Sequence, residues 1–430
     1  MPGKGINLMT IGGTDLEEKG VLVIGGGIAG IASALELARH GQQVFLVEKE
    51  PSIGGHAVSF CCKATEKCNK CSVCVLPEKM REVGINPQIS LFTSSEVREV
   101  RGKMGDFKVK IVQKPRFVDR DRCTACGLCE EACPIEPPKA IQCPSPGAVP
   151  YTFLVDKDRC LRFRGEKCQV CHDKCPTGAI NFDQDSQKIA LNVGAIVVAT
   201  GFDVFDAKEK ALLGYGKYPN VLTGLDVEER LRKVGSILLP CNGKPPADVA
   251  FIQCVGSRDE HIGNGYCSKV CCKYAMRLSR LLQYQNPEAK ITIFYMDLQT
   301  AGKGFEEFHE QCKETIRFVQ GIPVEISQVS SDRLGVKYED LSQGKIAVEN
   351  HDLVVLSVGM TPRKDAKNLA KILGINMGDS GFFDTLTPLD STGTNIEGIF
   401  ISGCCQDPKD IPATIAHSTQ AALSVIKSLT

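Results

Sequence analysis

The sequence predicts an α/β fold in which two strand–helix patterns flank a cysteine-rich module. Residues 21–24, 28–40 and 43–47 alternate as strand, helix and strand, which is the order of a parallel βαβ unit. A second α/β pattern begins at residue 245 and includes a helix expected over residues 304–319. Between the two patterns, residues 114–185 are rich in cysteine and proline and show little periodicity. We therefore expect two α/β domains, with a small module inserted into the first.

Glycines directly follow the first predicted strand and open the first predicted helix. Residues 25–30 read Gly-Gly-Gly-Ile-Ala-Gly. Gly25 permits a tight turn, Gly27 lets a pyrophosphate approach the backbone, and Gly30 lets the helix pack closely on the strand. Glu48 ends the next strand, about 20 residues on, where a carboxylate binds a ribose hydroxyl. This combination predicts a dinucleotide site.

Two later segments favour FAD over NAD at this site. An Ala-Thr-Gly segment ends the strand that follows the inserted module, and a late strand ends at Gly403. Both segments resemble those of the glutathione/thioredoxin-reductase flavoproteins, which implies FAD. That family usually has an aspartate after the late glycine, whereas Cys404 and Cys405 follow it here and are expected to pack near the flavin. The other residues assigned to the FAD site are Lys49, Gly54, Gly55, Ala199, Thr200, Gly201, Lys409 and Ile411.

The inserted module carries two runs of cysteines that each end in Cys-Pro. The first, from Cys123, has the Cys-x2-Cys-x2-Cys-x3-Cys-Pro spacing of bacterial ferredoxins, and the second, from Cys160, has seven residues where two are usual. A zinc ribbon is the alternative. In two-cluster ferredoxins the fourth cysteine of each run binds the other cluster. The first [4Fe–4S] centre is expected on Cys123, Cys126, Cys129 and Cys175, and the second on Cys160, Cys168, Cys171 and Cys133.

Four more cysteines lie where a two-domain flavoprotein holds NAD(P)H. Residues 249–255 read as a buried strand and residues 269–282 as a helix, but no G-x-G-x-x-G turn joins them. Soft thiolate ligands select iron–sulfur clusters. A third, non-standard [4Fe–4S] site is therefore expected on Cys254, Cys267, Cys271 and Cys272.

A further group of cysteines follows the second glycine pair. Three of its members have the ligand spacing Cys-x2-Cys-x2-Cys. A fourth cluster, a zinc ion, a redox-active dithiol with a thiolate of lowered pKa, and inert thiols all remain open. The group comprises Cys61, Cys62, Cys68, Cys71 and Cys74.

Composition excludes several classes of protein. The net charge is zero and the pI is near 7, so the chain has no signature of binding to nucleic acid or to an anionic membrane. No apolar run approaches about 18 residues, so no membrane span is expected, and the N-terminus has no signal-peptide core. The 22 cysteines, many of them at metal-ligand spacings, predict a reducing cytoplasmic location, as in an anaerobe.

From about residue 19 onward, the chain resembles the A subunit of heterodisulfide reductase. The resemblance rests on the glycine motif, on residues 71–74 (Cys-Ser-Val-Cys), on the inserted ferredoxin, on the spaced cysteine quartet and on residues 403–412. The A subunit of the quinone-interacting membrane-bound oxidoreductase complex is similar. The resemblance implies a two-domain thioredoxin-reductase-like flavoprotein fold with an inserted two-cluster ferredoxin module. It also implies FAD, several [4Fe–4S] clusters, and partners that include other subunits and redox proteins such as ferredoxin.

The resemblance also points to residues near the flavin. Family members usually have a lysine five residues after the last quartet cysteine, and this position is Arg277 here. Arginine stays charged and is not a tunable proton donor, so Lys273 is the alternative. In some members the flavin bifurcates electrons between two acceptors. The resemblance allows a homodimer within the complex, and membrane association through partners alone.

These observations lead to one domain plan and one leading function. The FAD-binding domain is expected at 19–113, 186–244 and 373–430, the ferredoxin at 114–185 and the second Rossmann-like domain at 245–372. The expected function is that of a flavin and iron–sulfur electron-transfer subunit. The alternatives are an NAD(P)H-dependent reductase subunit resembling the small subunit of glutamate synthase, and a redox-sensing scaffold whose clusters are structural.

Overall fold

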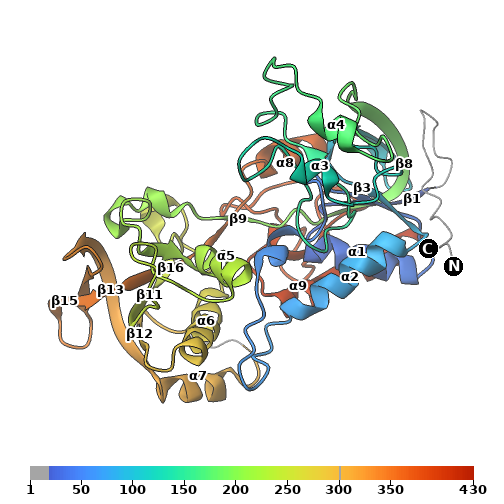
Figure 1. Cartoon of the computed structure of the whole chain (residues 1–430). Coiled ribbons are helices and arrows are strands. Elements are labelled where there is room, and N and C mark those ends of the chain that lie inside the picture. The colour runs from blue at the N-terminus through green and yellow to red at the C-terminus, as the bar shows by residue number, and fades with distance from the viewer. Residues whose placement is uncertain (1–18, 300–301) are drawn as a thin grey trace.

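The computed structural model describes residues 19–299 and 302–430, which form two α/β lobes and a smaller cysteine-rich insert (Figure 1). The sheet of the first lobe has the order β3-β2-β1-β8-β5-β4, and β18 also pairs with β8. Its strands are β1 (Gly20–Ile24), β2 (Val44–Val47), β3 (Ile89–Phe92), β4 (Ser95–Lys103), β5 (Asp106–Gln113), β8 (Gln187–Val198) and β18 (Ile399–Ile401). Its helices are α1 (Ile28–Arg39), α2 (Leu76–Ile85), α8 (Ala366–Leu373) and α9 (Ile411–Leu429), with 3-10 turns η1 (Gly55–Ser59), η2 (Val73–Val75) and η6 (Gly403–Cys405).

Helices cover both faces of this sheet, which explains why its central strands are continuously apolar. All five residues of β1 and all four of β2 are buried. Leu35 and Val425, from α1 and α9, share one hydrophobic cluster with Val23 of β1, whereas Ala370 of α8 packs on the other face with Leu22. The carboxyl end of β1 therefore lies in a well-packed layer, where the glycine turn begins.

The cysteine-rich insert takes the place of a hairpin connection. β5 and β8 are antiparallel neighbours, and Gln113 at the end of β5 lies opposite Gln187 at the start of β8. The module therefore leaves and re-enters the sheet at one point, where a long insertion does not disturb the strand order. The insert has its own small core around Phe117, Phe153 and Ile180. Its elements are α3 (Leu128–Glu131), β6 (Ile141–Gln142), β7 (Leu154–Val155) and α4 (Val170–Lys174).

The second lobe is built on a sheet of order β10-β16-β11-β12-β13-β14-β15. The first five strands pair in parallel, and β14 and β15 extend the sheet antiparallel beyond β13 at the far end of the lobe (Figure 1). Its strands are β10 (Val221–Thr223), β11 (Asp248–Val255), β12 (Lys290–Tyr295), β13 (Ile316–Gln328), β14 (Leu334–Asp340), β15 (Lys345–His351) and β16 (Leu353–Val358). Its helices are α5 (Gly224–Val234), α6 (Cys271–Gln285) and α7 (Phe305–Lys313), with 3-10 turns η3 (Ala207–Glu209), η4 (Ala211–Leu213) and η5 (Glu260–Ile262).

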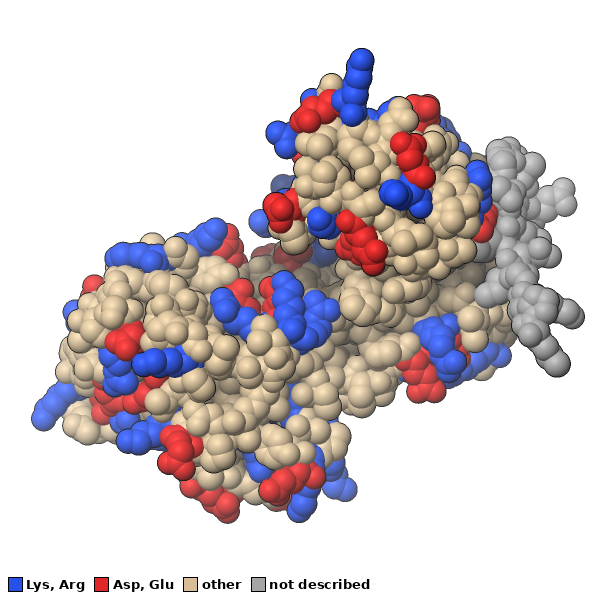
Figure 2. All heavy atoms as spheres, in the orientation of Figure 1, with Lys and Arg blue, Asp and Glu red and all other residues tan. Residues whose placement is uncertain are grey.

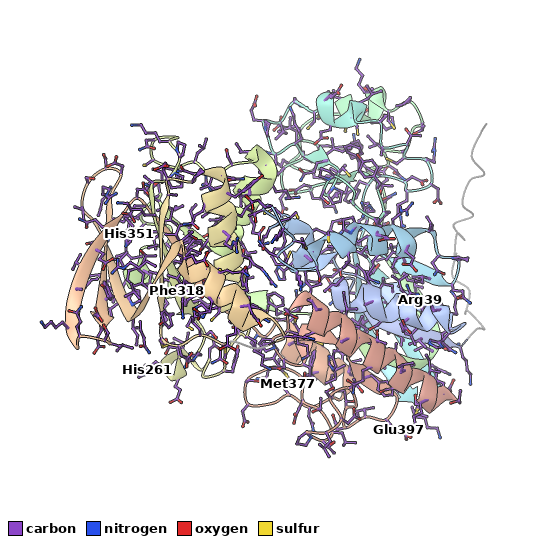
Figure 3. All side chains as sticks on the ribbon, turned by 90° about the horizontal axis from the view of Figure 1, so that it is seen from below. Arg39, His261, Phe318, His351, Met377 and Glu397 are labelled. Carbon is purple, nitrogen blue, oxygen red and sulfur yellow. The ribbon has the colours of Figure 1, made fainter. Side chains whose placement is uncertain are left out.

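The lobes are joined by two chain crossings that pair with each other. β9 (Asp203–Val204) and β17 (Met360–Thr361) form a two-stranded antiparallel link, with Met360 opposite Val204. In Figure 3, Phe318 and His351 mark the second lobe, and Arg39 and Glu397 lie on the opposite side of the molecule, in the first lobe. Every helix in the described part of the chain is too short or too polar to cross a bilayer.

Two local expectations differ from the structure. The helix predicted over 304–319 ends at Lys313, and β13 begins at Ile316 because Ile316 and Phe318 pair in parallel with Ile291 and Ile293 of β12. The spacing of apolar residues in a short run fits a helix as well as a strand, and pairing with a neighbouring strand decides between the two. In addition, β10 pairs with β16, so the second sheet begins before residue 245. With three residues, β10 is too short to show the alternation of buried and exposed residues that identifies a strand in a sequence.

Charged residues of both signs are mixed over the face of the molecule that Figure 2 shows. On this face, the mixture of signs fits the zero net charge of the chain.

The core of the second lobe should tolerate truncation poorly. Phe251 of β11 is fully buried between strands and helices, so Phe251→Ala is expected to lower the free energy of unfolding of this lobe by about 3–5 kcal/mol. Ile346→Ala, on β15 where the side chain is 63% exposed, is the matched control and should change it by less than about 0.5 kcal/mol. Denaturant unfolding followed by circular dichroism checks both values, and equal losses would contradict this description of the core.

Candidate functional site

A cavity of about 790 Å³ lies between the glycine turn of the first lobe and helix α6 of the second. Most residues that the sequence assigns to FAD line it, together with Lys273 and Arg277. Gly30 and Gly403 lie behind its wall, where they pack against Gly25 and Ala29 respectively. The assigned lining residues are Gly25, Gly27, Glu48, Lys49, Gly54, Gly55, Ala199, Thr200, Gly201, Lys409 and Ile411.

The three motif glycines have different geometric roles. Gly25 has a φ of +106°, and a Cβ there would lie 2.5 Å from the Ala199 carbonyl oxygen. A Cβ on Gly30 would lie 1.7 Å from the Gly25 carbonyl oxygen, so only glycine lets α1 start this close to β1. A Cβ on Gly27 would meet no protein atom nearer than 4.0 Å. The space in front of Gly27 is therefore open to a ligand at the N-terminus of α1.

Polar groups at this end of the cavity suit an adenosine ribose. Glu48 is 8% exposed and accepts hydrogen bonds from the amides of Gly26 (2.5 Å) and Glu50 (2.8 Å). Burial raises the pKa of Glu48 above its ordinary value. The buried Thr200 hydroxyl has no hydrogen-bond partner among the described residues and is available to a ligand. Lys49 lies 2.8 Å from Asp365, so its ammonium is already paired. The donors, acceptors and open glycine cradle fit FAD.

The other end of the cavity is formed around the start of α9. Asp410 caps this helix: its side chain accepts a hydrogen bond from the Ala413 amide at 2.9 Å, and its carbonyl accepts one from the Thr414 amide at 2.8 Å. Pro412 has no N–H, so the Ile411 amide is the one that remains for a ligand at this helix start. Burial lowers the pKa of Lys409, whose ammonium donates to the Gln406 side chain at 2.5 Å. Cys404 lines the cavity, whereas Cys405 points away and donates to the Val198 carbonyl at 3.1 Å.

Helix α6 supplies the facing wall. Val270, Lys273, Tyr274 and Arg277 line the cavity from successive turns. The Arg277 guanidinium donates to the carbonyl oxygens of Asn69 and Lys70 at 2.8 and 3.1 Å, and burial lowers its pKa. The Lys273 ammonium lies 5.4 Å from the ring centroid of Phe305. Both candidate catalytic side chains thus border the cavity, and Arg277 also holds the cysteine-rich loop.

The quartet cysteines gather at the N-terminus of the same helix. Burial and then the neighbouring thiols of Cys254, Cys272 and Cys267 raise the pKa of Cys271. Burial and then Cys272 raise the pKa of Cys254 to about 11. The Lys269 amide donates to the Cys267 sulfur at 3.2 Å. Mutually repelling thiolates in one buried place are stabilised by a cationic metal centre, so the donor set fits an iron–sulfur cluster.

The ferredoxin cysteines also lie in groups. Burial and then Cys160 raise the pKa of Cys171 to about 11, and Cys168 and Cys133 contribute in the same direction. These four are the set expected from the crossed ferredoxin pattern. In the first set, burial and then Cys123 raise the pKa of Cys129 to about 12. Its other members are the exposed Cys126 and the half-buried Cys175, whose sulfur accepts a hydrogen bond from the Ala179 amide at 3.3 Å.

The five cysteines after the second glycine pair do not behave as one group. Cys71 lines the cavity, whereas Cys62, Cys68 and Cys74 are exposed. Burial and then Glu228 raise the pKa of Cys61 to about 12, as expected of an inert thiol. The Lys70 amide donates to the Cys68 sulfur at 3.4 Å, two residues on, as Lys269 does to Cys267 in the quartet.

The arrangement of the possible ligands restricts the kind of metal centre that the cysteine groups can hold. Within residues 19–299 and 302–430, no three His, Cys, Asp or Glu side chains converge as the ligands of a single metal ion do. A single zinc holds its sulfur ligands about 2.3 Å from one point, whereas a cubane cluster separates its ligands by its own width. His261, in the loop between Cys254 and Cys267, is exposed at the edge of the second lobe (Figure 3).

The sequence did not single out three residues at the cavity wall. Lys63, Glu228 and Tyr274 meet from a loop and two helices. No spacing could have found them, because they are far apart along the chain. The one weak indication in the sequence was the position of Lys63 directly after Phe60, Cys61 and Cys62.

Comparisons with known proteins agree with this geometry. The sequence profile described as pyridine nucleotide-disulphide oxidoreductase matches residues 19–422. The chain belongs to this family. Its flavoprotein fold implies FAD, in agreement with the cavity.

Several relatives are similar over most of this chain. The A subunit of the H(2):CoB-CoM heterodisulfide,ferredoxin reductase of Methanothermobacter marburgensis is 42% identical over 93% of the chain and 62% of that protein. The second of two iron-sulfur A subunits of the CoB–CoM heterodisulfide reductase of Methanopyrus kandleri is 44% identical over 95% of the chain and 64% of that protein. The chain therefore spans less than two thirds of the length of these relatives.

Solved structures support the fold. Thioredoxin reductase of Lactococcus lactis matches with a TM-score of 0.52 at 16% identity, over 96% of this chain and 99% of that one. Thioredoxin reductase of T. acidophilum matches with a TM-score of 0.51 at 14% identity, over 95% and 98%. The two-domain thioredoxin-reductase-like fold expected from the sequence is confirmed.

The open space in front of Gly27 leads to a test of the cavity. Gly27 has a φ of −73° that any residue adopts, so Gly27→Ala should fold normally while its methyl group displaces the pyrophosphate. We expect FAD affinity to fall tenfold or more, measured by titrating FAD into deflavinated protein. Gly378→Ala, whose Cβ would make only a 3.9 Å contact, is the control. Unchanged affinity in Gly27→Ala would place the pyrophosphate elsewhere.

Proposed function

We propose that the chain is the FAD- and iron–sulfur-containing electron-transfer subunit of a heterodisulfide-reductase-like complex. One observation carries this proposal: helix α6 bears Cys271 and Cys272 on its first turn, and Lys273, Tyr274 and Arg277 of the same helix line the FAD cavity. A second, smaller cavity of about 70 Å³ shares Tyr274 with the first and is lined by Cys271. The quartet and the cavity are thus neighbours through one rigid element.

FAD, when bound, takes up two electrons and passes them on singly or together. Gly27 and the start of α1 hold its pyrophosphate, and Glu48 holds its ribose. The Ile411 amide at the start of α9 and the Lys409 ammonium face the other end of the cavity. Lys273 and Arg277 are the groups we assign to the flavin on the quartet side, where Arg277 adds fixed positive charge rather than a proton.

Iron–sulfur clusters on the cysteine sets provide single-electron routes. We assign two [4Fe–4S] centres to the insert and one to the quartet, on the grouping of their thiols. The loop that carries the five cysteines after the second glycine pair remains a candidate site for a fourth cluster or for a redox-active dithiol. The hydrogen bond from the Lys70 amide to the Cys68 sulfur favours cluster ligation. The ligands assigned are Cys123, Cys126, Cys129, Cys133, Cys160, Cys168, Cys171, Cys175, Cys254, Cys267, Cys271 and Cys272.

The partners follow from the same chemistry. A chain whose electrons leave through clusters requires another redox protein, and the names of the relatives specify heterodisulfide and ferredoxin. We propose other subunits of such a complex and a ferredoxin as partners, with a homodimer and partner-mediated membrane contact as further arrangements. None of the 22 cysteines, all of which lie within the described residues, forms a disulfide, which supports a reducing cytoplasmic location. Flavin bifurcation belongs to this proposal.

Iron content tests the quartet. We expect about 12 iron atoms and one FAD per chain, from three [4Fe–4S] centres. Cys271→Ser should lose about four iron atoms and keep FAD, measured by iron and flavin assays after anaerobic purification. Cys312→Ala, in α7 and without a partner at ligand spacing, is the matched control and should keep all the iron. An unchanged iron count in Cys271→Ser would remove the third cluster.

A nicotinamide test separates the proposal from an NAD(P)H-dependent reductase. The segment 256–270 joins β11 to α6 without a G-x-G-x-x-G turn, so nothing there presents a helix N-terminus to a pyrophosphate. NADH and NADPH are therefore expected not to reduce the flavin over the seconds that follow mixing in an anaerobic stopped-flow experiment, whereas dithionite should reduce it. Rapid reduction by either nucleotide would overturn the proposal.

A further inference from the structure

A buried ion pair lies at the wall of the FAD cavity, outside the glycine turn and the quartet. The Lys63 ammonium and the Glu228 carboxylate are in direct contact, and their side chains are 3% and 0% exposed. Lysine and glutamate are rarely so buried unless paired, and burying both ions is unfavourable. A charge kept at such a place is a candidate for function.

The pair is oriented with respect to the cavity. Lys63 lines the cavity, whereas Glu228, on α5, does not. The carboxylate therefore stands behind the ammonium, on the side of the second lobe. The amide of Cys61 donates to the second Glu228 oxygen at 2.7 Å, and the Lys63 ammonium donates to the Cys61 carbonyl at 3.2 Å. This closed set of contacts fixes the ammonium at the cavity wall.

Aromatic rings complete the setting. The Lys63 nitrogen lies 5.3 Å from the ring centroids of both Phe60 and Tyr274, within the range of a cation–π contact. Tyr274 belongs to α6, so Lys63 lies at the α6 end of the cavity and not at the ribose end near Glu48. The ammonium is thus the one ion of this group that borders the cavity.

We propose that Lys63 sets the reduction potential of the flavin. Uptake of two electrons and one proton gives the reduced ring system one negative charge, and a fixed cation in a cavity poor in water stabilises that charge. Glu228 acts as a positioning residue, because it holds the ammonium without facing the cavity. The inference rests on FAD occupying this cavity, as proposed above, and it adds a residue that neither the glycine motif nor the cysteine pattern contains.

Protein-film voltammetry on the complete, anaerobically purified protein tests this role, since it separates a two-electron flavin wave from one-electron cluster waves. In Lys63→Met the ratio of reduced to oxidised flavin at a fixed potential should fall about tenfold, a shift of about 30 mV to lower potential for a two-electron couple. Glu228→Gln, which leaves the ammonium without its counter-charge, should shift the wave the other way.

Matched controls exist on the same elements. Lys67→Met, on the exposed part of the same loop, and Glu229→Gln, on the exposed face of α5, should leave the flavin wave unmoved. Because removing one partner leaves a buried ion unpaired, the double variant Lys63→Met/Glu228→Gln guards against a folding defect and should follow Lys63→Met. Full FAD content with the wave of both Lys63 variants at the control position would overturn the inference. Absence of FAD from the unmodified protein would instead contradict the proposed function.

Discussion

The rest of the site depends on helix α6 serving two sites at once. Its first turn holds Cys271 and Cys272, while Tyr274 and Arg277, further along, form the wall of the FAD cavity. A helix is rigid over this length, so the quartet cannot move without moving the cavity wall. Fixed separation between redox centres is what an electron-transfer chain requires, and here the backbone hydrogen bonds of one helix provide it.

The loop of residues 60–75 fastens this helix to the first lobe. Figure 1 shows the loop running between the lobes beside α6. Arg277 binds the loop carbonyls at Asn69 and Lys70, and Lys63 enters the ion pair with Glu228. Both contacts cross from one lobe to the other. Thioredoxin-reductase-like lobes joined by short links are free to rotate by default. The buried Lys63–Glu228 pair and the partly exposed Arg277 contacts oppose such rotation.

The sequence predicted what depends on local backbone geometry. The glycine turn is found because Gly25 and Gly30 meet local steric needs, as the 1.7 Å clash at Gly30 shows. The ferredoxin ligands stay a prediction that rests on cysteine spacing alone. Prediction failed where tertiary contacts decide. Ile316 and Phe318 fit a helix until β12 pairs with them, and Lys63 and Glu228 are separated by most of the first lobe in sequence. Neither the periodicity of apolar residues nor the spacing of motif residues predicts contacts between segments so far apart in the sequence.

The connection between β11 and α6 differs from that of a nicotinamide site in a way that suits the cluster we propose there. In a dinucleotide site this connection is a short glycine turn, but here residues 256–270 form a folded loop. The Ser268 amide donates to the Ser257 hydroxyl at 3.0 Å, and the Met360 amide, in the interlobe link, donates to the Ser268 hydroxyl at 2.9 Å. This staple returns the chain to α6 with Cys267 beside Cys254. This loop does not present a helix N-terminus to a phosphate group. Instead it brings the Cys254 sulfur, at the end of β11, close to the sulfurs of Cys267 and Cys271 at the start of α6.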